Sequence, residues 1–294
     1  MNTNEFITLR NIVKIYGSGE NLFPALKGID LDIYKGEFLA LMGPSGSGKS
    51  TMANILGCLD KATEGSYLFN GVDVFALNRT QTALLRRNYI GFIFQGFNLL
   101  ARTTALENVE LPLLYRGIGK KERRKKARQA LDMVGLLNWE KHTSAQLSGG
   151  QQQRVAIARA IASNPLFLLA DEPTGNLDSK RSVEIMEILT SLNKELGITI
   201  LMVTHEEDMA KYASREIHFK DGEINNAFLL ALRQITRNYM RAFLTMLGVI
   251  IGVGAVIIMI NLGNGTQSMI KSAIESLGSN LLMVHISKNI ESGV

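Results

Sequence analysis

The glycine-rich segment 43–50 (GPSGSGKS) carries the clearest chemical signal in the 294-residue chain. It follows the apolar run 38–42 and opens the helical segment 50–57. Glycines at this spacing let backbone N–H groups converge on phosphates at a helix N-terminus. In such a loop Lys49 reaches the β and γ phosphates of a nucleotide, and the Ser50 hydroxyl ligates Mg²⁺. The candidate phosphate-binding residues are Gly43, Pro44, Ser45, Gly46, Ser47, Gly48, Lys49, Ser50 and Thr51.

Two adjacent carboxylates, Asp171 and Glu172, follow the apolar run 166–170. An uninterrupted apolar run is typical of a strand buried on both faces, and an open α/β sheet binds ligands at the ends of such strands. We expect Asp171 to hold the Mg²⁺ shell and Glu172 to act as general base toward the attacking water. A solvated acidic loop, the simpler interpretation, would not need an apolar strand leading into it.

The segment 147–151 (LSGGQ) narrows the class, because it resembles the signature motif of ATP-binding cassette (ABC) ATPases. Phosphate-binding-loop proteins in general lack this motif. Further positions match the same family in order: Tyr16 as the aromatic residue that stacks on adenine, Gln95 in the Q-loop, Asp178 in the D-loop and His205 as the switch histidine. Singly, each has a structural explanation, since a lone tyrosine or histidine usually serves packing. Together, in order and with fitting spacing, they favour the ABC ATPase.

The resemblance implies a dimer with two shared ATP sites. Each ATP would lie between Lys49 and Ser50 of one copy and the signature residues Ser148, Gly149, Gly150 and Gln151 of the other. It also implies that Gln95 joins Ser50 and Asp171 around Mg²⁺. In the same way, His205 and Gln95 would place the γ-phosphate and the water for Glu172. The expected cofactors are ATP and Mg²⁺.

From position 6 to about 220, β-rich runs alternate with helical patterns, which predicts an α/β domain with a mostly parallel sheet covered by helices. Runs 90–94 and 198–203 are the other candidate buried strands, and 106–115, 120–134 and 181–195 are helical patterns. The resemblance adds a helical subdomain to this fold. A turn at Asp221 and Gly222 closes the cassette, so we predict an ATP-binding domain over 1–225.

The residues beyond the ATP-binding domain predict a membrane segment. Region 226–241 is amphipathic, with Arg233, Arg237 and Arg241 on one side, and should lie flat on a membrane surface. Residues 242–262 carry no charge and match the length of a transmembrane helix. A buried core helix is the alternative. Because the arginines precede the apolar run, the ATPase is expected on the cytoplasmic side and 263–294 as the start of a periplasmic domain.

The composition of the chain excludes several classes of protein and of site. The chain is 46% apolar with five prolines, which argues against widespread disorder. Its only cysteine, Cys58, fits a reducing compartment and a place in the core, and no zinc-ligand spacing occurs. The N-terminus does not resemble a secretory signal. The net charge of +5 includes the basic run 120–128 (KKERRKKAR), which we interpret as a solvated helix face and not a nucleic-acid site, because no aromatic residues interleave the charges.

Finer stretches resemble the MacB-like macrolide-exporter family and its relatives, the lipoprotein-releasing (LolD-like) and FtsE-like ATPases. These stretches are 54–60, 91–95, 147–154, 170–178 and 202–206. The MacB-like family fits best, because it places ATPase and permease on one chain with the ATPase first, and 231–252 is similar to the start of its permease. The resemblance implies a bacterial inner-membrane homodimer that works with a periplasmic adaptor and an outer-membrane channel.

Two features depart from that family. The linker 222–227 is short, and the chain ends at Val294, where the family continues with a large periplasmic domain and three more helices. We therefore expect a fragment or a truncated reading frame. The first alternative is a lipoprotein-releasing or cell-division ABC ATPase, although those keep ATPase and permease on separate chains. The second is a non-transport ABC ATPase acting on ribosomes or DNA, which would have no membrane helix.

Overall fold

The computed structural model describes residues 5–19, 21–225 and 239–276. The chain divides into two compact units, Met1–Asn226 and Ala227–Val294. The predicted amphipathic helix over 226–241 lies outside the described residues up to position 238.

A six-stranded sheet forms the centre of the first unit. Its strands are β3 (Phe38–Met42), β6 (Ile90–Phe94), β7 (Phe167–Asp171), β8 (Thr199–Val203), β9 (Arg215–Lys220) and β10 (Glu223–Asn225). The strand order is β10-β9-β3-β8-β7-β6, and all neighbours are parallel except β9 and β10. The turn at Asp221 and Gly222 joins that antiparallel pair, with both residues at positive φ. The mostly parallel sheet predicted from the sequence is therefore confirmed.

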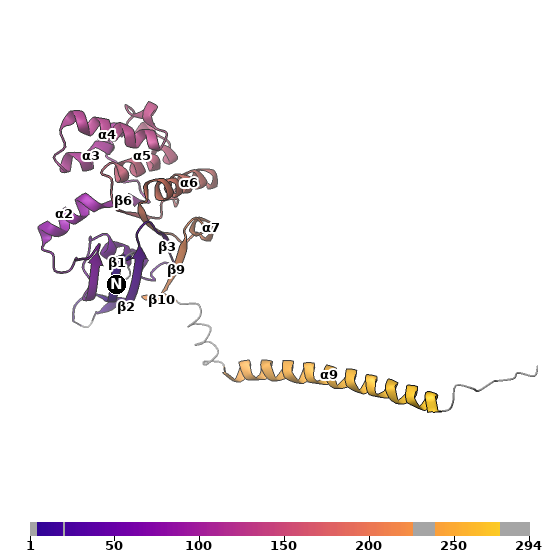
Figure 1. Ribbon diagram of the computed structural model, residues 1–294. Coiled ribbons are helices and arrows are strands. Elements are labelled where there is room, and N and C mark those ends of the chain that lie inside the picture. The colour runs from indigo at the N-terminus through magenta and orange to yellow at the C-terminus, as the bar shows by residue number, and fades with distance from the viewer. Residues whose placement is uncertain (1–4, 20, 226–238, 277–294) are drawn as a thin grey trace, which may run out of the picture. The chain divides into compact units, whose positions relative to one another are not determined.

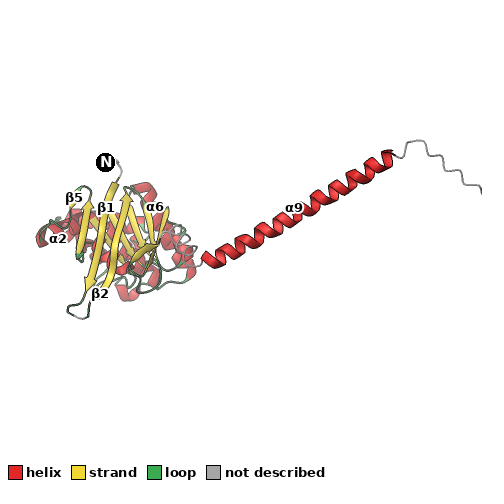
Figure 2. Cartoon of the chain, turned by 90° about the horizontal axis from the view of Figure 1, so that it is seen from below, coloured by secondary structure: helices red, strands yellow, loops and turns green. Residues whose placement is uncertain are grey.

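A second sheet is antiparallel and was not predicted from the sequence. It consists of β1 (Glu5–Tyr16), β2 (Phe23–Tyr34), β4 (Glu64–Phe69) and β5 (Val72–Asp73), in the order β2-β1-β4-β5. Figure 2 shows its long strands β1 and β2 side by side. The hairpin between them pairs Tyr16 with Phe23, so two aromatic residues meet next to the turn.

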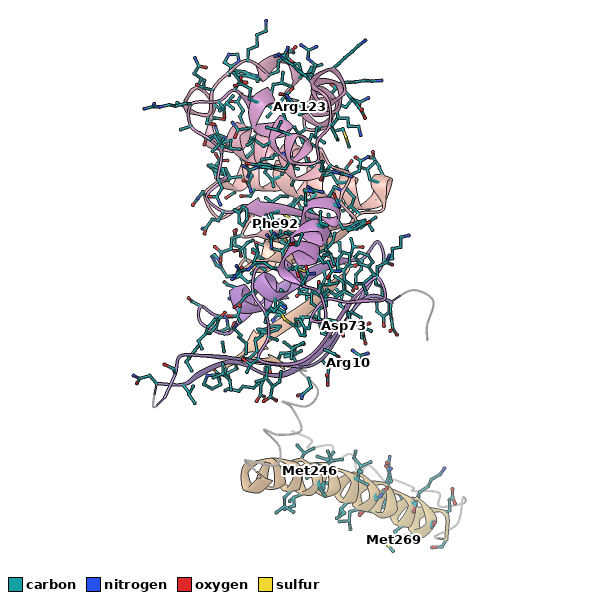
Figure 3. The ribbon with its side chains drawn as sticks, turned by 90° about the vertical axis from the view of Figure 1, so that its left-hand side faces the viewer. Arg10, Asp73, Phe92, Arg123, Met246 and Met269 are labelled. Atoms are coloured by element: carbon teal, nitrogen blue, oxygen red, sulfur yellow. The ribbon has the colours of Figure 1, made fainter. Side chains whose placement is uncertain are left out.

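The helices of the first unit are α1 (Lys49–Leu56), α2 (Arg79–Tyr89), α3 (Ala105–Tyr115), α4 (Lys120–Met133), α5 (Gly149–Ile161), α6 (Ser179–Leu196) and α7 (Glu207–Ala210). Short 3₁₀ turns occupy Leu137–Trp139 and Ser144–Gln146. Helices α2, α3 and α5 follow the N-cap residues Asn78, Thr104 and Ser148, each of which forms a reciprocal capping box. Helices α3, α4 and α5 gather at one end of the unit (Figure 1). In Figure 3, Arg123 marks that end, Arg10 and Asp73 the opposite end, and Phe92 lies between them.

The parallel sheet is buried on both faces, because successive side chains of its strands enter two different cores. In β8, Ile200 and Met202 pack with α3 to α6, whereas Leu201 and Val203 pack with α1 and the antiparallel sheet. Strands β3 and β7 alternate in the same way. Cys58 is buried in the second core, as predicted, and burial raises the pKa of its thiol to about 11. It is therefore a packing residue with an unreactive thiol.

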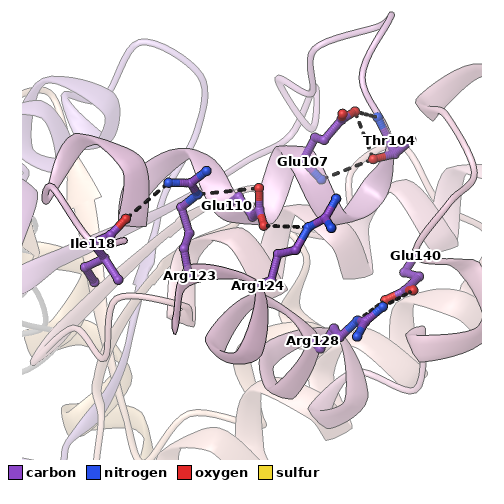
Figure 4. Close-up of polar contacts among 8 residues, drawn as sticks. All are labelled: Thr104, Glu107, Glu110, Ile118, Arg123, Arg124, Arg128 and Glu140. Carbon is purple, nitrogen blue, oxygen red and sulfur yellow. Dashed lines mark hydrogen bonds and ion pairs between the residues drawn. The ribbon is translucent and has the colours of Figure 1, made fainter. Parts of the chain in front are cut away.

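The basic run of α4 differs in part from the predicted solvated face. Lys121 and Lys125 are exposed, but the Arg123 side chain is only 16% exposed. Arg123 and Arg124 flank Glu110 of α3, with Nε atoms 3.5 and 3.6 Å from its carboxylate oxygens (Figure 4). The figure also shows Arg128 donating to both oxygens of Glu140, at 2.7 and 2.8 Å. Several charges of this run thus hold the helical region together.

The described part of the second unit is one helix, α9 (Tyr239–Ser276), of 38 residues. Its segment Met246–Ser276 contains an 18-residue stretch with a mean hydropathy of 2.4 and is, by length and composition, long and apolar enough to cross a membrane. The large side chains from Met246 to Ile274 are exposed, and those of Met246 and Met269 extend outward from the ribbon (Figure 3). A helix of this length measures about 57 Å, more than the ~30 Å apolar core of a bilayer. The helix thus includes all of the predicted span 242–262 and continues to Ser276.

Candidate functional site: a phosphate-binding cavity

The predicted site residues are brought together by the direction of the strands. Strands β3, β8, β7 and β6 run parallel and side by side, in register at Leu41 with Val203, Val203 with Asp171, and Asp171 with Phe94. Their carboxyl ends therefore lie along one edge of the sheet. The phosphate-binding loop, His205, Glu172 and Gln95 each follow one of these ends. This is the edge at which open α/β sheets bind ligands.

The phosphate-binding loop connects the buried strand β3 with helix α1. Gly43 has φ +143°, and a Cβ there would lie 2.2 Å from the carbonyl oxygen of Phe219. Gly48, the residue before α1, has φ +104°, and a Cβ there would lie 2.8 Å from the carbonyl oxygen of Ala25. Any side chain at these two positions would be strained and would also collide with backbone. The glycines are thus needed for the loop to turn into the helix.

A cavity of about 270 Å³ lies over this loop. Its lining contains six of the predicted phosphate-binding residues, namely Ser45, Gly46, Gly48, Lys49, Ser50 and Thr51. Glu172 and His205 line the same cavity from the ends of β7 and β8. The other three predicted loop residues, Gly43, Pro44 and Ser47, lie outside the lining. So do Tyr16, Gln95 and Asp171. A larger cavity of about 650 Å³, bordered by Phe92 and Tyr115, shares no lining residue with it.

Lys49 is buried at the floor of the phosphate site. Its Nζ donates hydrogen bonds to the carbonyl oxygens of Gly43 at 2.6 Å and Pro44 at 2.8 Å. Burial lowers the pKa of Lys49, and the charges of Glu172 and Asp171 act in the opposite direction. A buried ammonium held mainly by neutral carbonyls gains much from an anion placed against it. The electrostatics of the loop thus favour a phosphate ligand.

Asp171 is the last residue of β7 and lies next to Glu172. Burial raises the pKa of Asp171, the charge of Glu172 raises it further, and Lys49 partly offsets both effects. A divalent cation bound at a half-buried carboxylate beside another carboxylate would offset the repulsion between their charges. Among the described residues no cluster of three His, Cys, Asp or Glu could hold a metal alone. The donor set therefore fits Mg²⁺, which uses one or two protein oxygens together with substrate phosphates.

Glu172 is held in a strained conformation, with φ +45°. Its backbone N–H donates to the carbonyl oxygen of Val203 at 2.9 Å, and its carboxylate Oε1 lies 3.0 Å from His205 Nδ1. In the following loop, Thr174 Oγ1 donates to Glu206 Oε1 at 3.0 Å. Three contacts thus join the loop after β7 to the last residue of β8 and to the loop that follows it. Such strain at a non-glycine residue persists only where the surroundings fix it, and it concentrates at functional sites.

Gln95 and the predicted D-loop contact each other beside this loop. The Asn176 side chain donates to the backbone oxygen of Gln95 at 2.8 Å. A Cβ on Gly175 would lie 2.7 Å from Gln95 Nε2, so the Gln95 amide rests against the backbone of that glycine. Asp178 caps α6 by accepting from the Arg181 N–H at 3.0 Å. The Gln95 side chain is thereby placed next to the loop that carries Glu172.

The signature residues form the start of α5 and do not line the cavity. Ser148 and Gln151 form the capping box: the Ser148 N–H donates to Gln151 Oε1 at 2.9 Å, and the Gln151 N–H donates to Ser148 Oγ at 3.4 Å. Gly149 and Gly150 occupy the first turn. One chain therefore does not bring its own signature residues to its own phosphate-binding loop.

Tyr16 lies at the end of β1 in a polar cluster that we did not anticipate. Its hydroxyl donates to Asp60 Oδ2 at 2.8 Å, while Lys14 Nζ contacts Asp60 Oδ1 at 2.8 Å and stands 4.7 Å from the centre of the Tyr16 ring. Phe23, the cross-strand partner of Tyr16, lines the phosphate cavity and was also missed. The signal for Phe23 was the glycine-rich turn after Tyr16, which marks a hairpin.

Comparisons with known proteins identify related sequences for both parts of the chain. A family model described as ABC transporter matches residues 26–175, and one described as MacB-like periplasmic core domain matches residues 242–293. The macrolide export ATP-binding/permease protein MacB of Marinobacter nauticus is 45% identical over 97% of this chain and 48% of its own length. Its counterpart in Escherichia coli K12 is 42% identical over 96% and 49%. The chain thus spans about half the length of these curated relatives.

Solved structures give the same result for the first unit. The dimeric structure of MJ0796, a bacterial ABC transporter cassette, is 50% identical, with a TM-score of 0.70, over 75% of this chain and 97% of its own. A dimeric post-hydrolysis state of MJ0796 bound to ADP and Pi is 49% identical, also with a TM-score of 0.70. The match of the family model over half the chain, together with these structures, identifies the family. The chain belongs to the ABC transporter family.

Proposed function

We propose that this chain is the ATP-hydrolysing part of a MacB-like exporter and works as a homodimer in the bacterial inner membrane. One observation carries the proposal: Lys49, Ser50, Glu172 and His205 line a single cavity at the carboxyl edge of the sheet. That set combines a phosphate ligand, a metal ligand, a base and the residue that orients it. The similarity to MacB proteins along nearly the whole chain supports the exporter assignment.

ATP binding would use the phosphate-binding loop together with the ring of Tyr16. The Lys49 ammonium, now on two carbonyl oxygens, would turn to the β and γ phosphates, and the loop N–H groups would hold the remaining oxygens. We place the adenine on the face of the Tyr16 ring opposite Lys14. Asp171, Ser50 and Gln95 would hold Mg²⁺, which when bound supplies positive charge against the phosphates.

Hydrolysis would depend on the Glu172 carboxylate. The base accepts a proton from the water that attacks the γ-phosphate, while His205 holds Oε1 and so fixes the direction of the carboxylate. Gln95, packed against Gly175, would place the water. Because the signature residues do not line this cavity, Ser148, Gly149, Gly150 and Gln151 would close the site of a second copy. Two copies then share two sites.

The second unit supplies the membrane attachment in this proposal. Helix α9 would span the inner membrane, with the ATPase domain in the cytoplasm and the residues after the span in the periplasm. By resemblance, a periplasmic adaptor and an outer-membrane channel would be partners of the full transporter. Macrolides, named in the relatives, are the first substrates to test.

Nucleotide binding can be tested on residues 1–226. This part forms a compact unit, and relatives of it have been solved as separate cassettes. Saturating MgATP should raise its melting temperature, since a ligand at 100 times its Kd contributes about 2.7 kcal/mol. Lys49→Ala should abolish both that rise and hydrolysis, whereas Lys120→Ala, the same change at an exposed position on α4, should alter neither. Normal turnover in Lys49→Ala would refute the assignment of the loop.

Membrane attachment is tested separately on the full chain. The protein should pellet with membranes and resist alkaline carbonate, and protease added to sealed inside-out vesicles should digest the ATPase domain. A protein released by carbonate would favour a non-transport ATPase. Protection from the protease would reverse the proposed orientation.

A further inference from the structure

A buried glutamine on α5, Gln153, makes a contact that the core does not require. Its side chain is fully buried, and its Nε2 donates to the carbonyl oxygen of Pro173 at 2.6 Å. Its Oε1 is also buried and has no hydrogen-bond partner within the described part of the chain. An unpaired buried carbonyl costs free energy, so an unbranched apolar side chain of similar size would serve packing better. The contact with Pro173 is the feature that a glutamine provides here.

That contact restrains the loop of the catalytic base. Pro173 directly follows Glu172, whose φ of +45° is strained. The backbone of Glu172 is fixed on one side by its bond to Val203 and on the other by the bond from the Gly175 N–H to its carbonyl oxygen at 3.1 Å. Gln153 adds a restraint from a different element, helix α5. A residue with a strained backbone keeps its conformation only where several contacts fix it.

The same helix restrains the segment that follows Gln95. Arg159, two turns after Gln153 on α5, donates to the backbone oxygens of Asn98 at 2.5 Å and Phe97 at 2.9 Å. Asn98 and Phe97 also have positive φ, +50° and +61°. Helix α5 therefore holds the strained backbone beside Glu172 and the strained backbone after Gln95. Both restraints thus come from one continuous helix.

The N-terminal end of α5 lies in the signature segment, with Ser148 as its N-cap residue. Gln153 is five residues further along, about 7.5 Å of helix rise. In the dimer proposed above, the start of α5 contacts the ATP held by the partner, while Gln153 contacts the loop that hydrolyses the chain's own ATP. A shift of α5 on binding the partner's nucleotide would thus reach Pro173 through one hydrogen bond.

We propose that Gln153 is a positioning residue that couples the two ATP sites of the dimer, by linking the signature end of α5 to the loop of Glu172. The inference rests on the proposed function, because it requires two shared sites. It predicts that removing the Gln153 bond lowers hydrolysis and weakens cooperativity, without changing nucleotide affinity at the phosphate-binding loop.

The test compares residues 1–226 in four forms: wild type, Gln153→Met, Gln153→Leu and Gln129→Met. Gln153→Met keeps length and removes the donor; Gln153→Leu is a second apolar replacement should the first fail to fold. Gln129→Met makes the same change at an exposed position of α4. Rates at varied MgATP give kcat, KM and the Hill coefficient. We expect Gln153→Met to reduce kcat about tenfold, the equivalent of one hydrogen bond of about 1.4 kcal/mol.

The Hill coefficient of Gln153→Met should fall toward 1 from a wild-type value above 1. Its Kd for nucleotide should equal that of wild type, and its melting temperature should be the same or higher. Gln129→Met should match wild type in every measurement. Introducing Gln153→Met into a Glu172→Gln background should still give a MgATP-dependent dimer. Wild-type kcat and Hill coefficient in a folded Gln153→Met or Gln153→Leu would overturn the proposal. A reduced kcat with lower melting temperature and unchanged cooperativity would likewise overturn it, in favour of a structural role.

A pH profile of Gln153→Glu gives a readout that packing alone would not produce. When protonated, the introduced carboxyl has an O–H that can donate to Pro173, and when ionised it has none. Burial raises the pKa of an introduced glutamate above its ordinary value. The rate of Gln153→Glu relative to wild type should therefore rise as pH falls through that raised pKa. A flat ratio would contradict the donor role. Wild type without hydrolysis would instead refute the proposed function itself.

Discussion

His205 Nδ1 lies 3.0 Å from Glu172 Oε1, across the ends of two neighbouring parallel strands. The strands β7 and β8 are in register at Asp171 and Val203, and the Glu172 N–H donates to the Val203 carbonyl at 2.9 Å. The contact between the two side chains is therefore supported by the register of the two strands from which their loops leave the sheet. Both side chains border the cavity over the phosphate-binding loop.

Replacing this histidine should impair the chemical step and spare nucleotide binding. We expect His205→Ala to lower kcat about 100-fold, because Glu172 loses the contact that orients its carboxylate. The Kd for ATP, which we propose is set by the phosphate-binding loop and Tyr16, should change less than about threefold, or ~0.7 kcal/mol. His218→Ala removes an exposed histidine on β9 and serves as the control. Near-normal turnover in His205→Ala would show that this contact is dispensable.

Asp171→Asn should stabilise the nucleotide-free domain and weaken its response to Mg²⁺. Burial and the charge of Glu172 disfavour an ionised Asp171, so removal of the charge relieves repulsion. A gain of about 1 kcal/mol would raise the melting temperature of a domain of this size by about 2–4 °C. The additional stabilisation by MgATP over ATP with a chelator should be lost. A lower melting temperature with an intact Mg²⁺ response would contradict this role.

The same residue gives a pH dependence. Because the folded-state pKa of Asp171 is raised, the folded domain binds this proton more tightly than the unfolded chain does. Its contribution to stability is therefore present at low pH and is lost as pH rises through the raised pKa. Melting curves without nucleotide should show this component in wild type and lack it in Asp171→Asn. Identical pH profiles would contradict the pKa assignment.

Asp60→Ala should weaken ATP binding through Tyr16. Burial raises the pKa of Tyr16, and the hydrogen bond to Asp60 raises it further, so the tyrosine is held as a neutral phenol. Loss of that bond frees the ring and leaves Lys14 without its carboxylate partner. We expect Kd for ATP to rise about 5-fold, equivalent to about 1 kcal/mol, with kcat at saturating ATP unchanged. Asp132→Ala, at an exposed position of α4, is the control, and an unchanged Kd in Asp60→Ala would remove Asp60 from the site.

The buried strands were predictable because their signal is local. The apolar runs 38–42 and 90–94 match β3 and β6 residue for residue, and both 166–170 and 198–203 lie within one residue of β7 and β8. Strands buried on both faces must be apolar throughout, so their limits show in the sequence. The motif residues at their ends could then be assigned to one edge of the sheet.

The antiparallel sheet and the Tyr16 cluster were less accessible, because they depend on pairing over long distances. Lys14 and Asp60 are 46 residues apart, and the residues around either position do not predict that the two side chains are in contact. The strands of this sheet also mix buried and exposed residues, which gives a weaker signal than an apolar run. Gln153 was missed for a related reason. The functional role was given to the signature residues that precede it, and its hydrogen-bond partner is a backbone carbonyl in a distant loop.

The central claim is that Glu172 is the base of a site completed by a second copy, and Glu172→Gln tests it most directly. Glutamine keeps size and hydrogen bonding but cannot accept the proton of the attacking water. Binding should survive, since in the proposed site the phosphates would contact the loop and the partner's signature residues. Size-exclusion chromatography of residues 1–226 should show wild type mainly as a monomer with MgATP, and Glu172→Gln as a nucleotide-bound dimer without hydrolysis. A variant that hydrolyses at the wild-type rate, or stays monomeric at saturating MgATP, would contradict the account.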